Sequence, residues 1–371
     1  ARIGIHAGDV IVAENDLFGD AVNIAARLEA SAEPDGILLS RMVADLAGSD
    51  LNVPLRAEGS RRLKHIDRPI EVLSVDLSGN LASTAQKQRF ADSQKLRFCA
   101  TPDGTSLAWT ETGSGHPVVK APNWIGHLEL DWRNPGFAPI FSSISQRHRL
   151  VRFDARGNGL SDWDVDEISF EHFVEDLLTV FDAAGIERAP IFALSQGAAV
   201  AAAFAEKYPE RVSAIAMIGG FPVGRALRKS AKDRERAEAL KGMMQAGWDD
   251  DHPSLRDLLS DMLIPGASME DKLRYAEDMR AMISPKNLGR YRDVVDYLDV
   301  TGCLPRISAP TLVLHGQGDR MQPIEQGRRL AALLPNSKFI ALDTSNHLPV
   351  EDNRVWPLIE NEVLQFLSEH T

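Results

Sequence analysis

A serine between a strand pattern and a helix pattern is the first residue whose surroundings indicate chemistry. Ser195 stands in Pro190-Ile-Phe-Ala-Leu-Ser-Gln-Gly-Ala-Ala199, where an apolar run changes into an Ala-rich helical pattern. A sharp turn there needs small residues two positions before and two after the serine, because the two backbones approach closely. Ala193 and Gly197 meet that requirement. The pattern predicts a nucleophilic serine, with a simple helix cap as the alternative.

A candidate acid and a candidate base follow the serine along the chain. The strand pattern at 311–315 leads to Asp319, and the strand pattern at 338–342 leads to His347. Both side chains therefore come just after the carboxyl ends of strands, where active sites of open α/β sheets gather. We predict that His347 takes the proton of Ser195 and that Asp319 fixes the tautomer of the imidazole. The alternatives are a solvated loop aspartate and a histidine satisfied by a backbone carbonyl.

Alternating strand and helix patterns must position these three residues. The alternation predicts an α/β fold with a mostly parallel sheet covered on both faces. A stretch at about 221–300 has no strand signal and is predicted to be a helical insertion. We expect strands at 106–110, 117–119, 150–153, 190–193, 214–218, 311–315 and 338–342, and helices at 170–184, 197–208, 324–334 and 355–368.

Length and composition exclude several classes of protein. With 371 residues the chain predicts two domains, and 44% apolar residues suffice for a buried core. The net charge of −12, without a cluster of basic residues, argues against a nucleic-acid partner. Two cysteines at no metal-ligand spacing suit a reducing compartment, so we expect a cytoplasmic protein without a metal site. No apolar run is long enough to span a membrane.

From residue 95 to 371 the chain resembles the α/β-hydrolase family. The resemblance implies an α/β-hydrolase fold with a helical lid at about 221–300, a Ser-Asp-His triad and no cofactor. The motifs that carry it are Ala193-Leu-Ser-Gln-Gly197, His315-Gly-Gln-Gly-Asp319, Asn346-His347 and Phe153-Asp-Ala-Arg-Gly-Asn-Gly-Leu-Ser161.

Two backbone N–H groups are expected to hold the oxyanion of an acyl-transfer intermediate. One is that of Gln196, at the start of the helix that follows the serine. The family takes the second from the loop after the strand at 117–119, where relatives carry His-Gly and a bulky residue. This chain has Pro122-Asn123 there. The resemblance therefore assigns the second donor to Trp124, with a packing role as the alternative.

The helical insertion is expected to supply part of an apolar substrate pocket. It contributes Met243, Met244 and Trp248, and methionines adapt to irregular apolar ligands. Trp132 and Trp124 precede the serine and are expected to line the same pocket. Such a pocket predicts a neutral carboxylic ester of short or medium length. Methionines at helical spacing are also compatible with ordinary core packing.

The first part of the chain resembles the C-terminal half of a class III adenylate or guanylate cyclase catalytic domain. The motifs are Arg2-Ile-Gly-Ile-His-Ala-Gly8 and the segment 16–29. We predict a small α+β domain at 1–77, a linker at 78–94 whose composition buries little surface, and a hydrolase domain at 95–371.

The cyclase resemblance assigns nucleotide-contacting roles to a few residues. It implies that Asn23 and Arg27 contact the ribose and phosphates and that Asp16 and Lys64 read the base. Two-metal chemistry needs paired carboxylates, and the sequence has no such metal motif, so we expect this domain to lack cyclase activity. Half of a domain leaves a sheet edge uncovered. We therefore expect it to dock on a second copy of the chain, as a homodimer, or on the hydrolase domain.

These observations together predict a serine carboxylesterase that acts on a small-molecule ester. Amidase, lactonase, perhydrolase and C–C hydrolase activities are alternatives, because the fold does not select the leaving group. A ligand-binding regulatory sensor with a degenerate cyclase module is an alternative of another class. A nucleotide-binding module that uses Asp16, Asn23 and Arg27 is a third.

Overall fold

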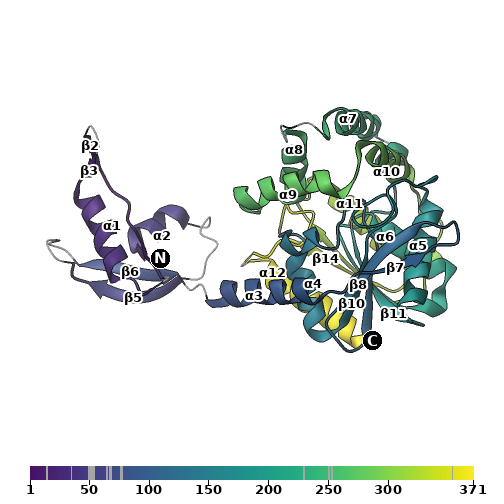
Figure 1. Ribbon diagram of the computed structural model, residues 1–371, viewed down its shortest axis with the longest axis horizontal. Helices are drawn as coiled ribbons and strands as arrows, with labels where there is room; N and C mark the ends of the chain where they lie inside the picture. The colour runs from purple at the N-terminus through teal and green to yellow at the C-terminus, as the bar shows by residue number, and fades with distance from the viewer. Residues whose placement is uncertain are drawn as a thin grey trace. The chain divides into compact units, whose positions relative to one another are not determined.

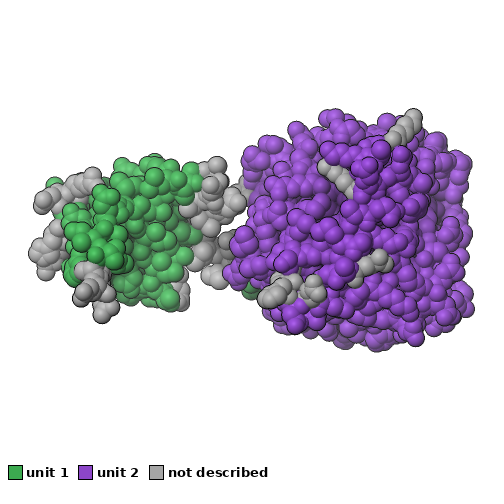
Figure 2. Space-filling view, turned by 90° about the horizontal axis from the view of Figure 1, so that it is seen from above, with its two compact units in different colours: residues 1–85 green, residues 86–371 purple. Residues whose placement is uncertain are grey.

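The computed structural model divides the chain into two compact units, residues 1–85 and 86–371, which are coloured separately in Figure 2. Each unit has its own core and is described by itself. No described helix is long and apolar enough to cross a membrane. The structure describes all residues except 14–15, 35, 49–54, 64–65, 67–68, 76–77, 229, 250, 252–253 and 353.

The second unit is built on an eight-stranded sheet with the strand order β14-β13-β12-β11-β9-β10-β8-β7. Strands from β14 to β10 run parallel, and β8 pairs antiparallel with both β10 and β7. The three central strands β11, β12 and β13 are almost wholly buried, as expected for parallel strands covered on both faces. The predicted parallel sheet is confirmed. Its strands are β7 (Arg97–Ala100), β8 (Ser106–Thr112), β9 (Pro117–Lys120), β10 (Arg149–Phe153), β11 (Ala189–Leu194), β12 (Val212–Ile218), β13 (Thr311–Gly316) and β14 (Ser337–Leu342).

Helices cover the sheet in two layers (Figure 1). The helix α4 packs with α12, and α5 packs with α6, while α6 lies against β11 and β12. The Ser169 hydroxyl caps α5 by accepting a hydrogen bond from the His172 N–H. These helices are α4 (Ala138–Arg147), α5 (Phe170–Ala183), α6 (Gly197–Lys207), α11 (Ile324–Leu333) and α12 (Trp356–Glu369), with short 3-10 turns η2 (Leu130–Arg133) and η3 (Pro209–Arg211).

The predicted helical insertion lies between β12 and β13, and its helices gather at the top of this unit in Figure 1. Serine caps begin three of them, at Ser230, Ser268 and Ser284. A proline follows the last cap, where its missing N–H costs no helical hydrogen bond. The elements are η4 (Arg225–Leu227), α7 (Ala231–Gly247), α8 (Ser254–Leu263), α9 (Met269–Met282), α10 (Pro285–Tyr297) and η5 (Leu304–Arg306).

The first unit is a small α+β domain, as predicted. Its four-stranded sheet has the order β1-β4-β6-β5, and β2 and β3 form a separate hairpin. A Cβ at Gly4 would lie 2.2 Å from the Ala25 carbonyl oxygen, so glycine lets β1 pack closely on α1. Its elements are β1 (Ile3–Ile5), β2 (Ile11–Ala13), β3 (Asp16–Phe18), α1 (Asp20–Ser31), β4 (Ile37–Ser40), α2 (Arg41–Ala47), β5 (Leu55–Arg61) and β6 (Ile70–Val75).

The segment expected to be a poorly ordered linker, 78–94, is mostly the helix α3 (Ser78–Ser93). Its Ala, Gln, Lys and Arg residues are good helix formers even though they bury little surface. The ring of Phe90 stacks on Trp132 with centroids 6.0 Å apart, which anchors the last turns of α3 on the second unit. The division between the units therefore falls within a helix.

Candidate active site

Ser195 occupies a strained turn between β11 and α6. Among the described residues it is the only one other than glycine with a positive φ, 53°. Its N–H donates to the Ile218 carbonyl at 2.9 Å, which ties the turn to β12. A Cβ at Gly197 would lie 2.7 Å from the Pro122 carbonyl oxygen, and Ala193 is fully buried. The close approach predicted from these small residues is present.

Ser195, His347 and Asp319 meet in a continuous hydrogen-bonded line. His347 Nε2 lies 2.8 Å from Ser195 Oγ, and His347 Nδ1 lies 2.7 Å from Asp319 Oδ2. Ser195 is 8% exposed and His347 is 2% exposed. With Nδ1–H donating to the carboxylate, Nε2 is free to accept the serine proton. The arrangement can therefore activate Ser195 and stabilise the imidazolium that results.

Asp319 is held in place by its own loop. Its Oδ1 accepts hydrogen bonds from the backbone N–H groups of Met321 and Gln322, at 2.8 and 2.9 Å. Its Oδ2 lies 3.5 Å from the Nε2 of a second imidazole, His315. Burial lowers the pKa of His315, so this ring is neutral and its Nε2–H can donate to the Gln322 carbonyl at 3.0 Å. His315 had no role predicted from the sequence, although it lies next to the last residue of β13, four residues before the acid.

The loop that carries His347 is fixed by the insertion and by β12. The His347 N–H donates to the Leu263 carbonyl at the end of α8, at 2.9 Å. Asn346 Oδ1 accepts from the Gly266 N–H at 2.7 Å. A Cβ at Gly219 would lie 3.0 Å from His347 Cε1, so the imidazole rests against a backbone without a side chain. The helical insertion thus positions the base.

The two expected oxyanion donors, Gln196 and Trp124, are 1% and 5% exposed respectively. Gln196 is the N-cap residue of α6, so its N–H belongs to the positive end of that helix. In the described part of the chain, neither backbone N–H donates to a protein acceptor. Both groups are therefore available to a substrate oxygen.

A buried lysine supports the loop that carries Trp124, a feature that the sequence alone did not reveal. Lys120 ends β9 and its ammonium donates to Asn123 Oδ1, while Asn123 Nδ2 donates to the Ile125 carbonyl at 2.6 Å. Burial lowers the pKa of Lys120 to about 8. The feature of the sequence that could have indicated this role is a lysine at the end of an apolar strand pattern. The side chain of Asn123 thus links the end of β9 to the loop that carries Trp124.

The loop at 153–161 forms a second buried polar cluster. Asp154 accepts hydrogen bonds from the N–H groups of Leu160 and Leu128, at 2.9 and 3.2 Å. Burial, and next the nearby carboxylate of Asp131, raise the pKa of Asp154 to about 7. Leu128 lies in the segment that follows Trp124, so the hydrogen bond from its N–H to Asp154 holds that segment in place.

The expected pocket residues separate into two groups. Met243 lines a cavity between the insertion and the Asp319 loop. Met244 and Trp248 are fully buried, and the Trp248 indole N–H donates to the Ile283 carbonyl at 2.9 Å. Trp132 packs between Phe90 and Phe141. The side chains of Met244, Trp248 and Trp132 are therefore buried by packing and are not among those that line this cavity.

The residues that resemble nucleotide contacts lie in the first unit. Asn23 and Arg27 are exposed on α1, one turn apart. Asp16 begins β3, but its side chain and the whole of Lys64 lie outside the described residues. Within the described ranges, no group of three or more His, Cys, Asp or Glu side chains could hold a metal ion.

Comparison with known proteins identifies the family of the second unit. The profile of the α/β hydrolase fold matches residues 121–354. The chain belongs to the α/β-hydrolase family. A 2-hydroxy-6-oxononadienedioate/2-hydroxy-6-oxononatrienedioate hydrolase from Cupriavidus pinatubonensis is 26% identical over 277 residues, which are 71% of this chain and 92% of that protein. An esterase from Exiguobacterium antarcticum has the same fold, with a TM-score of 0.64, 18% identity, and coverage of 73% of this chain and 98% of the esterase.

The N-terminal region of this α/β hydrolase has a different relative. A Rhizobium meliloti protein described as adenylate cyclase 3 is 37% identical over 71 residues, which are 19% of this chain. This chain spans about an eighth of that relative, since the match covers 12% of its length. The resemblance to a partial cyclase domain is confirmed, and it concerns only a short part of the cyclase.

Proposed function

We propose that this α/β hydrolase is a serine carboxylesterase that cleaves esters of short to medium acyl length. The observation that carries the proposal is the line from Ser195 Oγ through His347 to Asp319, with bonds of 2.8 and 2.7 Å. Nucleophile, base and orienting acid lie within hydrogen-bond distance of one another, as acyl transfer requires.

In the proposed reaction, Ser195 Oγ attacks the ester carbonyl while His347 Nε2 takes its proton. The N–H groups of Gln196 and Trp124 would stabilise the tetrahedral oxyanion. His347 then gives the proton to the leaving alcohol oxygen, and the C–O bond breaks to leave an acyl-serine. A water molecule, deprotonated by His347, attacks the acyl-serine and releases the acid and the free serine.

The direct test compares hydrolysis of 4-nitrophenyl butyrate by the native chain and by Ser195→Ala. We expect kcat to fall at least about 1,000-fold, since the nucleophile of a triad is lost. The control is Ser213→Ala, because Ser213 in β12 has a buried Oγ without a hydrogen-bond partner and lies outside the site. A fluorophosphonate label should attach to Ser195. Equal activity of Ser195→Ala and the native chain would instead favour a ligand-binding sensor.

A second candidate is hydrolysis of a carbon–carbon bond beside a ketone. The observation that favours it is the similarity to the Cupriavidus hydrolase over 92% of that protein's length. The substrate in its name is an oxo-dicarboxylate with no ester bond. Incubation with a vinylogous 1,5-diketone, followed at the absorbance of its enolate, separates the two reactions. Turnover of the diketone with no turnover of esters would replace the esterase assignment.

We also propose that the first unit has no cyclase activity and joins two copies of the chain. The β2–β3 hairpin supports this, because Ile11, Val12, Leu17 and Phe18 are all more than half exposed. Light scattering should give a dimer for the native chain and a monomer for the double variant Val12→Asp, Phe18→Asp. Equal masses would contradict the proposal. Calorimetry with ATP tests the alternative nucleotide-binding role of Asn23 and Arg27.

A further inference from the structure

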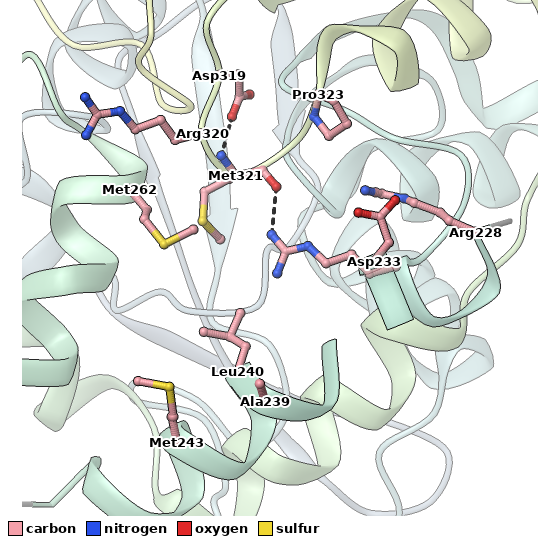
Figure 3. A pocket seen from close by; sticks show the side chains of 11 residues that line it. Arg228, Asp233, Ala239, Leu240, Met243, Met262, Asp319, Arg320, Met321 and Pro323 are labelled. Carbon is pink, nitrogen blue, oxygen red and sulfur yellow. Dashed lines mark hydrogen bonds between the residues drawn. The ribbon is translucent and has the colours of Figure 1, made fainter. Parts of the chain in front are cut away.

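A cavity of about 470 Å³ lies between the insertion and the loop that follows β13. Its walls come from η4, α7 and α8 on one side and from residues 319–323 on the other (Figure 3). Cavities of this size hold small organic molecules. Because Asp319 is part of the lining, the cavity borders the acid of the triad.

Part of the lining of this cavity is apolar and consists mostly of methionine. Leu240 and Met243 come from α7, Met262 comes from α8, and Met321 follows Asp319. Unbranched methionine side chains adjust to the shape of an alkyl chain. This part of the lining agrees with the apolar pocket expected from the sequence, and it suits the hydrocarbon part of a ligand.

The lining also contains a buried cation, Arg225 of η4, that has no ion pair among the described residues. Arg225 is 8% exposed, and its Nη2 donates to the Met321 carbonyl at 2.7 Å. Of the nearby carboxylates, Asp296 accepts two hydrogen bonds from Arg292, and Asp319 serves the triad. Among the described residues, no carboxylate lies within ion-pair distance of Arg225. Burial, and next the charge of Arg292, lower the pKa of Arg225 to about 10, which leaves it protonated at neutral pH.

The second arginine of the lining, Arg228, has hydrogen-bond acceptors within the protein. Its Nη2 donates to Gln322 Oε1 and its Nε donates to the Val223 carbonyl at 3.2 Å. Burial lowers the pKa of Arg228, and the carboxylate of Asp233, beside it in Figure 3, opposes that shift. Arg225 differs, because its Nε and Nη1 have no acceptor in the described part of the chain, and the residue lines the cavity.

A guanidinium with open N–H groups beside an apolar wall matches a carboxylate at the end of an alkyl chain. We propose that the cavity binds the free carboxylate of the substrate's acyl group through Arg225, so that the preferred substrates are half-esters of dicarboxylic acids. The proposal rests on the esterase function proposed above. It differs from the neutral ester expected from the sequence, because Arg225 and Arg228 line the cavity beside Asp319.

The test compares mono-4-nitrophenyl esters of adipic and suberic acid with the matching methyl 4-nitrophenyl diesters, in which the distal carboxylate is masked. We expect the native chain to have a kcat/KM at least about ten-fold higher for the half-esters, as for a charge-assisted hydrogen bond. Arg225→Met should lower kcat/KM for the half-esters roughly 10- to 100-fold and change that for the diesters less than about three-fold. Arg225→Lys, which keeps the charge, should retain part of the preference.

The matched control is Arg306→Met, which removes an exposed arginine paired with Glu206 at the opposite end of β13. It should leave both rates unchanged. A native chain without a preference for the half-esters overturns the proposal, and so does an equal loss for both substrates in Arg225→Met. If Arg225→Met does not fold, as judged by circular dichroism, the native preference and Arg225→Lys decide the question.

Calorimetry separates failure of this site from failure of the esterase proposal. Suberate should bind to the Ser195→Ala variant, and the added change Arg225→Met should abolish the binding. If neither ester is hydrolysed, the esterase proposal fails and this measurement alone decides the carboxylate site. Suberate binding that Arg225→Met does not weaken overturns the site.

Discussion

His315 Nε2 lies 3.5 Å from Asp319 Oδ2, the oxygen that also accepts a hydrogen bond from His347. The triad acid therefore faces two imidazoles, of which only His347 reaches the serine. Because burial keeps His315 neutral, it does not cancel the charge that stabilises the imidazolium of His347. The ring also holds the Asp319 loop through its hydrogen bond to the Gln322 carbonyl.

Gly327→Ala is expected to disturb this support. A Cβ at Gly327 in α11 would lie 2.5 Å from Nδ1 of the buried His315 ring. The clash should lower the free energy of unfolding by roughly 1–3 kcal/mol, despite the better helix propensity of alanine. Urea unfolding measures it. Gly242→Ala in α7 is the matched control, since nothing lies within 4 Å of its added Cβ, and it should raise stability by about 0.5–1 kcal/mol. Equal gains in both variants would contradict the role of His315.

Asp319→Asn should reduce kcat by about four orders of magnitude with little change in folding. The asparagine Oδ1 can still accept the N–H groups of Met321 and Gln322, so the loop is retained. Its amide N–H₂ would then face His347 Nδ1 and hold the imidazole in the tautomer that cannot accept the serine proton. Single-turnover kinetics with a 4-nitrophenyl ester measures the loss. The exposed Asp343→Asn, which weakens only a surface pair with Arg354, should leave kcat unchanged.

Asp154 predicts a pH dependence of stability. Its folded-state pKa is raised to about 7 from an ordinary 3.8, so between these values the native state holds a proton that the unfolded chain has lost. The contribution of Asp154 to stability is therefore present at pH 4 and is lost as the pH rises through 7. Relative to Asp154→Asn, the native chain should lose stability steadily over that range in urea titrations. A difference that stays flat, as expected for the exposed Asp164→Asn, would show that Asp154 is ionised throughout.

Residues adjacent to strand ends could be predicted from the sequence. Ser195, Asp319 and His347 each follow an apolar strand pattern, and parallel strands bring their carboxyl ends to one edge of the sheet. Their meeting therefore follows from local patterns and topology. The small neighbours Ala193 and Gly197 were informative for the same reason, because the turn at Ser195 is a local requirement.

Residues whose roles depend on packing between distant segments could not be predicted. Met244 and Trp248 are residue types that often line apolar pockets, but neighbouring segments of the chain bury both completely. Arg225 is the reverse case. In the sequence it is one arginine among many charged residues of the helical insertion, and it becomes a buried cation because η4 packs against the loop after β13. Periodicity does not specify which segments meet, so burial of an individual side chain is not determined locally.

Two truncations should show that the last turns of α3 belong to the hydrolase core. Gln94 Oε1 accepts hydrogen bonds from Trp132 Nε1 at 2.9 Å and Arg152 Nη2 at 3.1 Å, and Phe90 stacks on Trp132. Removing residues 1–85 keeps these contacts, so the esterase kcat/KM should stay within about two-fold of the native value. Removing residues 1–94 leaves the Trp132 indole N–H without its acceptor, takes away one of the two acceptors of Arg152 Nη2 and uncovers a core face. These losses should cost roughly 2–4 kcal/mol of unfolding free energy.

In the protein that lacks residues 1–85, Gln94→Ala removes the hydrogen bonds of Gln94 and keeps the stacking of Phe90 on Trp132. It should lower the free energy of unfolding by about 1–3 kcal/mol. The matched control is Gln88→Ala, because Gln88 bonds only to the exposed Asp92 of the same helix. Chemical unfolding of the four proteins gives each step separately. Equal stability of the two truncations would show that α3 is a spacer, and the division between the units would then lie after residue 94, as the composition of this segment first suggested.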